Sequence, residues 1–223
     1  MRASDLLSQP LSPWPEPSPG LEEAAADDPR DWPQATAFAL ARAAGGEGER
    51  RPVAMVTTAA WRAERGGLSA QGLAGLGIAP DRVILVRADK EAEALWAMEE
   101  VLKSGAVAGA VGTVRAAPFT TTRRLDFAAR QGRAAGVLLR VQGGGDLSAA
   151  RLRWRIGVEP SLPHPFDPKA PGLARMRAEL TRRRDGPLGA WMLEQDDDAH
   201  RLRLAAGLAD HGLVAVRRTD LAA

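Results

Sequence analysis

The side chains that most often carry out chemistry are few in this sequence and lie far apart. Its 223 residues include no cysteine, which excludes thiolate metal sites and cysteine nucleophiles. The three histidines, His164, His200 and His211, are too dispersed for a metal signature, and the carboxylates at 196–198 fit a polar hairpin tip better than a cation site. No GxSxG motif offers a serine nucleophile. The sequence therefore predicts no metal centre and no covalent catalysis.

Arginines are the other residues that could bind a ligand, and they concentrate in the second half of the chain. Residues 1–100 carry a net charge of −6, whereas residues 101–223 carry +8. The candidates for contact with DNA or a partner protein are Arg123, Arg124, Arg151, Arg153, Arg155, Arg182, Arg183 and Arg184. Arginine suits phosphates and carboxylates, but aromatic residues for base stacking are not interleaved with them. A solvated sheet face or a protein docking surface is therefore favoured over DNA, and arginine usage in a GC-rich genome is a further explanation.

The composition is that of a soluble globular protein with one sizeable core. Hydrophobic residues make up 45% of the chain and charged residues 26%. The sequence contains no run of 18 apolar residues and no apolar core of a signal peptide. We expect a cytoplasmic protein that is associated with the nucleoid when engaged, and no membrane contact.

The spacing of apolar residues predicts alternating helices and strands after a flexible, proline-rich segment at 1–20. The expected helices span 33–44, 68–76, 90–103 and 120–131, and the expected buried strands span 53–57, 82–87, 106–111 and 136–140. Asp89 is placed to cap the third of these helices. Continuous apolar runs separated by helices are typical of parallel strands buried on both faces. The central sheet should therefore be mostly parallel, with Trp96 and Trp154 in the core.

The pattern changes to strict alternation near residue 151. Residues 151–158 read RLRWRIGV, which places Arg151, Arg153 and Arg155 on one face of a half-exposed strand. Further short strands are expected at 176–183, 190–195 and 201–204, and they should extend the sheet in antiparallel fashion. The sequence thus predicts one α/β domain at 21–206, followed by a tail at 207–223.

Residues 76–114 resemble the core of the RecA-type recombinase fold, with a strand, the helix EALWAMEEVLKSGAV and the strand that normally carries a metal-binding acid. The later stretches RLRWRIGVEPS and RAELTRRRDGPLGAWMLE add a resemblance to the ImuA family. These are RecA-like accessory proteins encoded beside an inactive Y-family polymerase homologue in bacterial damage-inducible mutagenesis operons. The resemblance covers about residues 21–205 and implies a RecA-like α/β fold.

The resemblance also implies where a nucleotide site would lie, and the residues there do not suit it. The phosphate-binding loop would precede the helix at 33–44, yet AAADDPRDWPQAT contains neither glycine nor lysine and leads into Asp31, Trp32, Pro33 and Gln34. Ala59 stands where the catalytic glutamate would be, and Gly112 and Thr113 stand in place of the metal-binding acid. Losing all three elements removes phosphate positioning, water activation and charge neutralisation together. We expect no ATP hydrolysis and no cofactor, with Trp32 as a further candidate anchor for a partner.

The function that this resemblance implies is a non-catalytic role in SOS-induced, error-prone translesion synthesis. By the same resemblance the partners would be an inactive Y-family polymerase homologue of the ImuB type and the RecA recombinase. An error-prone replicative-type polymerase and DNA are further candidates. The alternative is a RecA-class, DNA-dependent ATPase with an atypical nucleotide site, which nucleotide binding would reveal.

Overall fold

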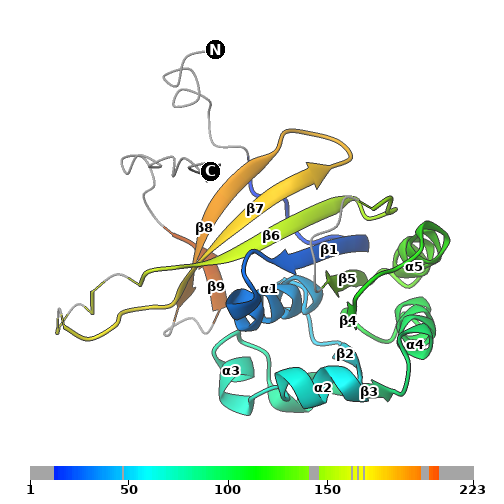
Figure 1. Cartoon of the computed structure of the whole chain (residues 1–223), viewed down its shortest axis with the longest axis horizontal. Helices are drawn as coiled ribbons and strands as arrows, with labels where there is room; N and C mark the ends of the chain where they lie inside the picture. The colour runs from blue at the N-terminus through cyan, green and yellow to red at the C-terminus, as the bar shows by residue number, and fades with distance from the viewer. Residues whose placement is uncertain are drawn as a thin grey trace, which may run out of the picture.

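Nine strands of the described chain form one sheet with helices on both faces (Figure 1). The computed structural model describes residues 13–46, 48–140, 146–161, 163–164, 166–167, 169–196 and 201–205. The predicted tail at 207–223 and the turn at 197–199 lie outside these residues. The strands are β1 (Gly20–Ala26), β2 (Val53–Thr58), β3 (Val83–Ala88), β4 (Gly109–Val114), β5 (Ala135–Arg140), β6 (Leu152–Glu159), β7 (Arg175–Arg183), β8 (Gly189–Asp196) and β9 (Arg201–Leu204).

The sheet has a parallel half and an antiparallel half. Its order is β3-β2-β4-β5-β1-β6-β7-β8-β9, and every neighbouring pair from β3 to β6 is parallel. The pairs β6–β7, β7–β8 and β8–β9 are antiparallel. The prediction of an α/β protein with a mostly parallel sheet and antiparallel strands near the C-terminus is confirmed.

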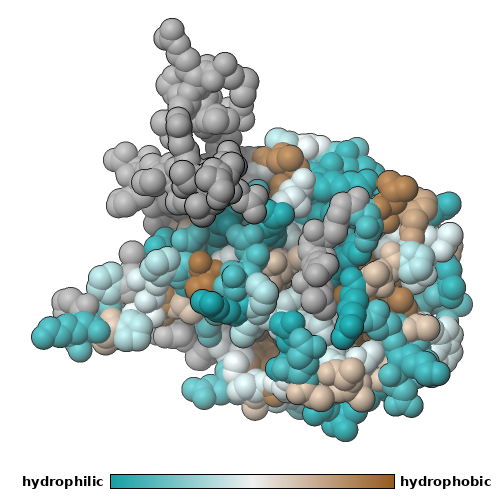
Figure 2. All heavy atoms as spheres, viewed as in Figure 1, coloured by the Kyte–Doolittle hydropathy of each residue, from teal (hydrophilic) through white to brown (hydrophobic). Residues whose placement is uncertain are grey.

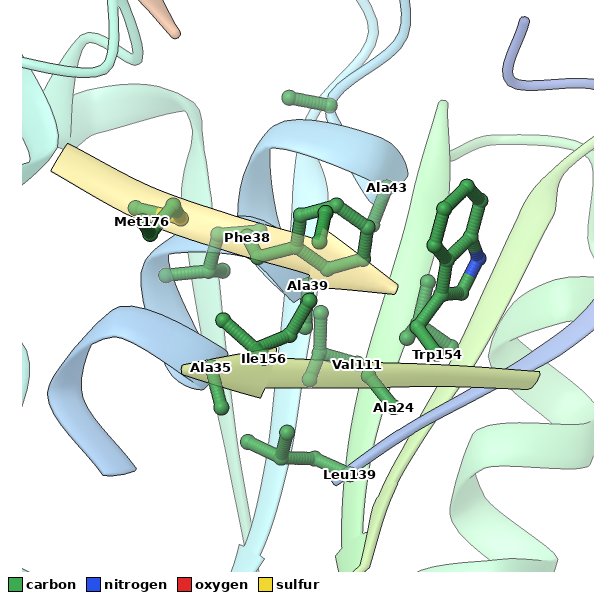
Figure 3. Packing of buried hydrophobic residues seen from close by; sticks show 14 of the residues in the cluster. Ala24, Ala35, Phe38, Ala39, Ala43, Val111, Leu139, Trp154, Ile156 and Met176 are labelled. Carbon is green, nitrogen blue, oxygen red and sulfur yellow. The ribbon is translucent and has the colours of Figure 1, made fainter. Parts of the chain in front are cut away.

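The helices divide the apolar core into two layers. The helices are α1 (Trp32–Ala43), α2 (Ala59–Arg65), α3 (Ala70–Ala74), α4 (Glu91–Lys103) and α5 (Phe119–Gln131). Helices α1 and α3 contribute to the core on one face, where Figure 3 shows Phe38 beside Ile156 and Trp154. Helices α4 and α5 cover the other face through Met98, Leu102 and Leu125 among others. Neither layer contains a helix that is long and apolar enough to cross a membrane, within the described residues.

Strand β1 was missed because its sequence, GLEEAAA, contains two adjacent glutamates. Glu22 and Glu23 are each only 3% exposed, since β1 lies between β5 and β6 in the interior of the sheet. Strand propensity disfavours glutamate, but ion pairing in the folded state stabilises both side chains at this position. Strand β1 therefore belongs to the interior of the sheet, ahead of the helix that follows it.

The expectation that residues 1–20 are loosely ordered is wrong for the part that the structure describes. Trp14 packs against Trp154 and Trp191, with ring centroids 5.2 and 5.3 Å apart, and meets Phe38 edge to face at 6.4 Å. Proline removes backbone donors but does not prevent an extended segment from placing one large apolar side chain on a core. Residues 13–19 are thus part of the folded domain.

The region between β2 and α4 differs most from its prediction. Strand β3 is an edge strand and not a buried one, with Ile84 44% and Leu85 54% exposed. The predicted helix at 68–76 shrinks to the five residues of α3, and the unpredicted α2 begins directly after Thr58, whose hydroxyl accepts a hydrogen bond from the Trp61 amide. Glycines around the two short helices limit their length.

Two smaller predictions about α4 and its neighbours are also wrong. The Asp89 side chain does not accept a hydrogen bond from the first turn of α4, as a cap would. Instead, the backbone N–H of Asp89 donates to the Glu93 side chain, at Oε2, over 3.1 Å. Trp96 is 61% exposed on the outer surface of α4, whereas Ala94, Leu95 and Met98 face the sheet. Trp154 is 2% exposed, as predicted.

Candidate functional site

The connection from β1 to α1 is the position at which a strand–loop–helix motif would bind phosphate, and it is closed by its own hydrogen bonds. Residues Pro29–Asp31 form a 3-10 turn, Asp28 Oδ1 accepts from the Arg30 amide at 2.8 Å, and the Asp31 amide donates to the Asp28 carbonyl at 2.9 Å. A phosphate loop instead leaves its amides free and adds a lysine. Here aspartates occupy the turn, and their negative charge opposes phosphate binding.

Trp32, the first residue of α1, packs inside the protein. Trp32 is only 5% exposed and lies 4.6 Å from the ring of Trp61, with the Arg65 guanidinium 4.8 Å above it. The expectation of an exposed tryptophan anchor is therefore wrong. Pro33 and Gln34 follow it in the first turn, where Pro33 lines a cavity and Gln34 has a buried Oε1 with no partner among the described residues.

The other expected nucleotide-site positions, Ala59, Gly112 and Thr113, lie near the carboxyl ends of β2 and β4, where they have structural roles. Gly112 and Thr113 are inside β4, which ends at Val114, and not at its terminus. A Cβ at Gly112 would lie 2.5 Å from Met98 Sδ, so any larger residue there would force the buried Met98 side chain of α4 to move. Ala59 is the exposed first residue of α2.

A cavity of about 460 Å³ does lie at these strand ends, but its charges are acidic. Glu64, Asp89 and Glu91 line it together with Thr113, and Arg115 is the one cation among the described residues that line it. Arg115 is within 4.0 Å of Glu91. Carboxylates without a lysine would repel a triphosphate. No group of three or more potential metal ligands is found in the part of the chain that the structure describes.

The arginine stripe of β6 exists, but two of its three members are bound to buried carboxylates. Arg153 Nε lies 2.7 Å from Glu23 Oε2, and Arg151 Nη2 lies 3.3 Å from Glu22 Oε1. The side chains of Arg151 and Arg153 are 23% and 13% exposed, so the expectation of a solvated sheet face or docking surface is wrong for these two residues. The alternation itself is confirmed, because Leu152, Trp154 and Ile156 face the core.

The third stripe residue belongs to a network on the face of the antiparallel strands. Arg155 lies 3.6 Å from Asp27, which also binds Arg177 at 2.8 Å. Arg177 further pairs with Glu179 at 2.7 Å and with Glu159 at 3.5 Å. Burial acts to lower the pKa of Arg177, but the hydrogen bond with Glu179 and the carboxylate charges outweigh it and raise that pKa. The charges on this face neutralise one another.

Glu22 is at the centre of a buried network that sequence reasoning missed. Arg42 binds it in bidentate fashion, with Nη2 2.6 Å from Oε1 and Nε 2.9 Å from Oε2, and Trp154 Nε1 donates to Oε2 at 3.0 Å. Arg42 also donates to the Pro15 carbonyl at 2.6 Å, and its guanidinium lies 5.4 Å from the Trp14 ring and 5.1 Å from the Trp154 ring. The only signal in the sequence was a pair of glutamates in an otherwise apolar run.

The remaining arginine candidates fall into two groups. Arg182, Arg183 and Arg184 donate to backbone carbonyls of Ser148, Pro187 and Ala149. Arg123 and Arg124 lie on α5; Arg123 stacks over Phe119 at 5.9 Å, and Arg124 binds Glu99 at 2.5 Å. Phe127 on the same helix is 69% exposed, so α5 presents aromatic and cationic side chains to solvent together.

An apolar cavity of about 420 Å³ lies between α1, the α2–α3 segment and strands β2 and β3. Trp32, Trp61, Met55 and Leu85 supply apolar walls. Arg62, Arg65 and Arg87 also line the cavity. Figure 2 shows hydrophilic side chains over most of one face of the molecule, with hydrophobic ones in small groups. The sequence does not reveal this cavity, because its pattern predicts no helix at α2 and predicts that β3 is buried inside the sheet.

Comparison with known proteins gives a family. Protein ImuA of Caulobacter vibrioides, in strain NA1000 / CB15N and in strain ATCC 19089 / CIP 103742 / CB 15, is 40% identical to this chain over 168 residues. The match covers 70% of this chain and 68% of each relative. No family model matches. Among solved structures, SulA from Pseudomonas aeruginosa matches with a TM-score of 0.44 and 20% identity over 55% of this chain and 98% of that one, which is too weak a likeness to argue from. On the strength of the two sequence relatives, the chain belongs to the ImuA family.

Proposed function

We propose that this protein is a non-catalytic accessory factor in SOS-induced, error-prone translesion DNA synthesis and that it acts by binding other proteins. Membership in the ImuA family supports a role in damage-inducible mutagenesis. The observation that carries the non-catalytic part is the closed, acidic connection between β1 and α1. A hydrolytic site would need phosphate-binding amides, a metal-binding acid and a base to activate water.

A RecA-like core is part of this proposal. Its support is the position of the β1–α1 connection, which follows a parallel strand inside the sheet and precedes a helix, as a phosphate loop does. The ends of β2 and β4 lie around the acidic cavity on the same edge of the sheet. On this proposal, the fold keeps the places of a nucleotide site while the residues at those places stabilise the protein.

The partners that we propose are an inactive Y-family polymerase homologue of the ImuB type and the RecA recombinase. An error-prone replicative-type polymerase and DNA are secondary candidates. Exposed aromatic residues support binding to macromolecules, since Trp96 and Phe127 are each more than half exposed on α4 and α5. Such complexes would form in the cytoplasm, at the nucleoid.

Nucleotide is expected not to stabilise the protein. With 5 mM ATP and magnesium, the melting temperature should stay within about 1 °C of its value without nucleotide, because a ligand stabilises only in proportion to its binding to the native state. Differential scanning fluorimetry measures this, and a RecA-type recombinase with an intact phosphate loop is the positive control. A shift of several degrees, or ATP turnover with DNA present, would favour the alternative of a DNA-dependent ATPase.

The exposed arginines of α5 are expected to contribute to any contact with single-stranded DNA. Replacing Arg123 and Arg124 by Gln should leave thermal stability nearly unchanged, because exposed ion pairs contribute little. The slope of log K against log salt should become shallower by about 1.4, or roughly 0.7 for each phosphate contact removed. Fluorescence anisotropy with labelled single-stranded DNA measures the slope, and Arg50→Gln, at another exposed arginine, is the matched control. An unchanged slope would show that Arg123 and Arg124 do not contact DNA.

A further inference from the structure

Strand β3 has a free, apolar edge. It pairs with β2 on one side, and no strand of the described residues pairs with its other side. The strand reads VILVRA, without the lysine, proline or bulge that commonly protects an edge from another chain. Its Ile84 and Leu85 are 44% and 54% exposed. This edge can accept the main-chain hydrogen bonds of an added strand.

The free edge adjoins the 420 Å³ cavity between α1 and the α2–α3 segment. Leu85 and Arg87 of β3 line the cavity, and they face the same side of the sheet as their partners Met55 and Thr57. Because side chains alternate along a strand, every second residue of an added strand would also face this side. The cavity is therefore placed to accept a side chain from a strand bound at β3.

Several polar groups at the cavity have no acceptor among the described residues. Arg62 and Arg87 form no ion pair with any described residue, unlike most arginines of the chain. Trp32 is 5% exposed, yet its Nε1–H has no acceptor among the described residues, and the same holds for the buried Arg65 Nε–H. Buried donors without acceptors are costly, and unpaired cations attract anions. Arg62 and Arg87 therefore suit a guest that carries negative charge.

We propose that the β3 edge and this cavity bind an extended, acidic segment of a partner protein as an added strand. A bulky apolar side chain of that segment enters the cavity beside Trp61 and Leu85, and carboxylates two residues away meet Arg62 and Arg87. The natural source of the segment, a partner in mutagenesis, rests on the proposed function; the site itself rests on the geometry of β3 and the cavity.

The surface favours a peptide over a nucleic acid. Stacking of bases needs open aromatic faces, whereas Trp32 is buried and its ring is already in contact with Trp61 and Arg65. The row of backbone N–H and C=O groups on an edge strand matches another peptide main chain, which a phosphodiester chain cannot imitate.

A defined peptide tests the proposal. The probe is the labelled octapeptide Thr-Glu-Val-Phe-Val-Asp-Val-Thr, whose Glu, Phe and Asp share one face, and the control peptide carries Lys in place of both acids. We expect the full-length protein to bind the probe at least roughly tenfold more tightly than the control, because like charges across an interface oppose binding. Amide hydrogen exchange should slow in Val83–Ala88 when the probe is bound.

Four variants locate the binding. Leu85→Lys, and separately Arg62→Glu with Arg87→Glu, should weaken probe binding about tenfold or more, by adding charge to the edge or reversing it at the cavity. The matched controls are Leu188→Lys, at a leucine that is 56% exposed, and Arg50→Glu, at an exposed arginine away from the cavity. Both controls should bind the probe like the wild type. All four variants must first show the wild-type melting temperature.

Each outcome decides a separate point. Failure of the probe to bind, no slowing of exchange in β3, or equal binding by Leu85→Lys would overturn the proposal. Single-stranded DNA that protects β3 while the probe does not would overturn it in favour of a nucleic-acid surface. If the probe binds at β3 but neither the polymerase homologue nor the recombinase displaces it, the site stands and the partners named under the proposed function are wrong.

Discussion

Replacing Glu22 by Ala is expected to lower the free energy of unfolding by about 3–5 kcal/mol, the usual cost of leaving one member of a buried ion pair alone. Glu22 and Arg42 are each 3% exposed, so water cannot replace the lost carboxylate. The Trp154 Nε1–H would lose its acceptor as well. Urea unfolding followed by tryptophan fluorescence measures the change.

Glu179 provides the matched control for this experiment. It also pairs with an arginine at 2.7 Å, but its side chain is 39% exposed. Glu179→Gln is therefore expected to cost less than about 1 kcal/mol. Adding Arg42→Met to a Glu22→Leu variant should recover part of the loss, because an apolar pair of similar volume removes the unpaired charge. Equal effects of Glu22→Ala and Glu179→Gln would show that the buried network does not stabilise the protein.

Removing residues 1–19 is expected to destabilise the protein by about 3 kcal/mol, close to the cost of deleting a buried aromatic side chain. Trp14 contacts two other tryptophans and Phe38, and Arg42 lies 5.4 Å from its ring. The truncation also removes the Pro15 carbonyl that accepts from Arg42. Buried Arg42 would keep its ion pair with Glu22, but it would lose the hydrogen bond to the Pro15 carbonyl and the contact with the Trp14 ring.

A chain that begins at Ser12 is the control for the truncation. It keeps Trp14, Pro15 and all their described contacts, so its unfolding midpoint should match that of the full-length protein. The single variant Trp14→Ala should reproduce most of the loss seen on removing residues 1–19. If both shortened chains unfold at the same denaturant concentration, the packing of Trp14 does not contribute to stability.

The parts of the fold that could be predicted from the sequence are those in which the local pattern and the tertiary environment agree. Strands β2 and β5 are apolar runs buried inside the sheet, and α4 and α5 bury the faces that their spacing predicts. The alternation of β6 is likewise visible in its sequence. Strand β1 could not be found, because its glutamates are stabilised by arginines that are distant in the chain.

The candidate site was harder to predict for the same reason. An apolar run such as VILV reads alike in an inner strand and at an edge, and only the order of strands distinguishes them. The absence of a phosphate loop could be recognised, since it depends on residue types alone. Which arginines are paired could not, because Arg153 meets Glu23 only after β1 and β6 lie side by side. Arg62 and Arg87 stand out only once these pairs are known.

The place of β1 in the sheet has a consequence for the order in which the protein can fold during synthesis. Both strands that flank β1 come late in the chain, and the Glu22–Trp154 hydrogen bond joins residues 132 positions apart. The β2–β3–β4 unit can assemble from neighbouring segments, whereas β1 must wait first for β5 and then for β6 to leave the ribosome. During that interval the two charged glutamates keep the otherwise apolar β1 segment soluble and oppose its aggregation with other chains. Glu22 can meet Arg42 early, because the two residues are 20 positions apart, whereas Glu23 meets Arg140 and Arg153 only when β5 and β6 have formed.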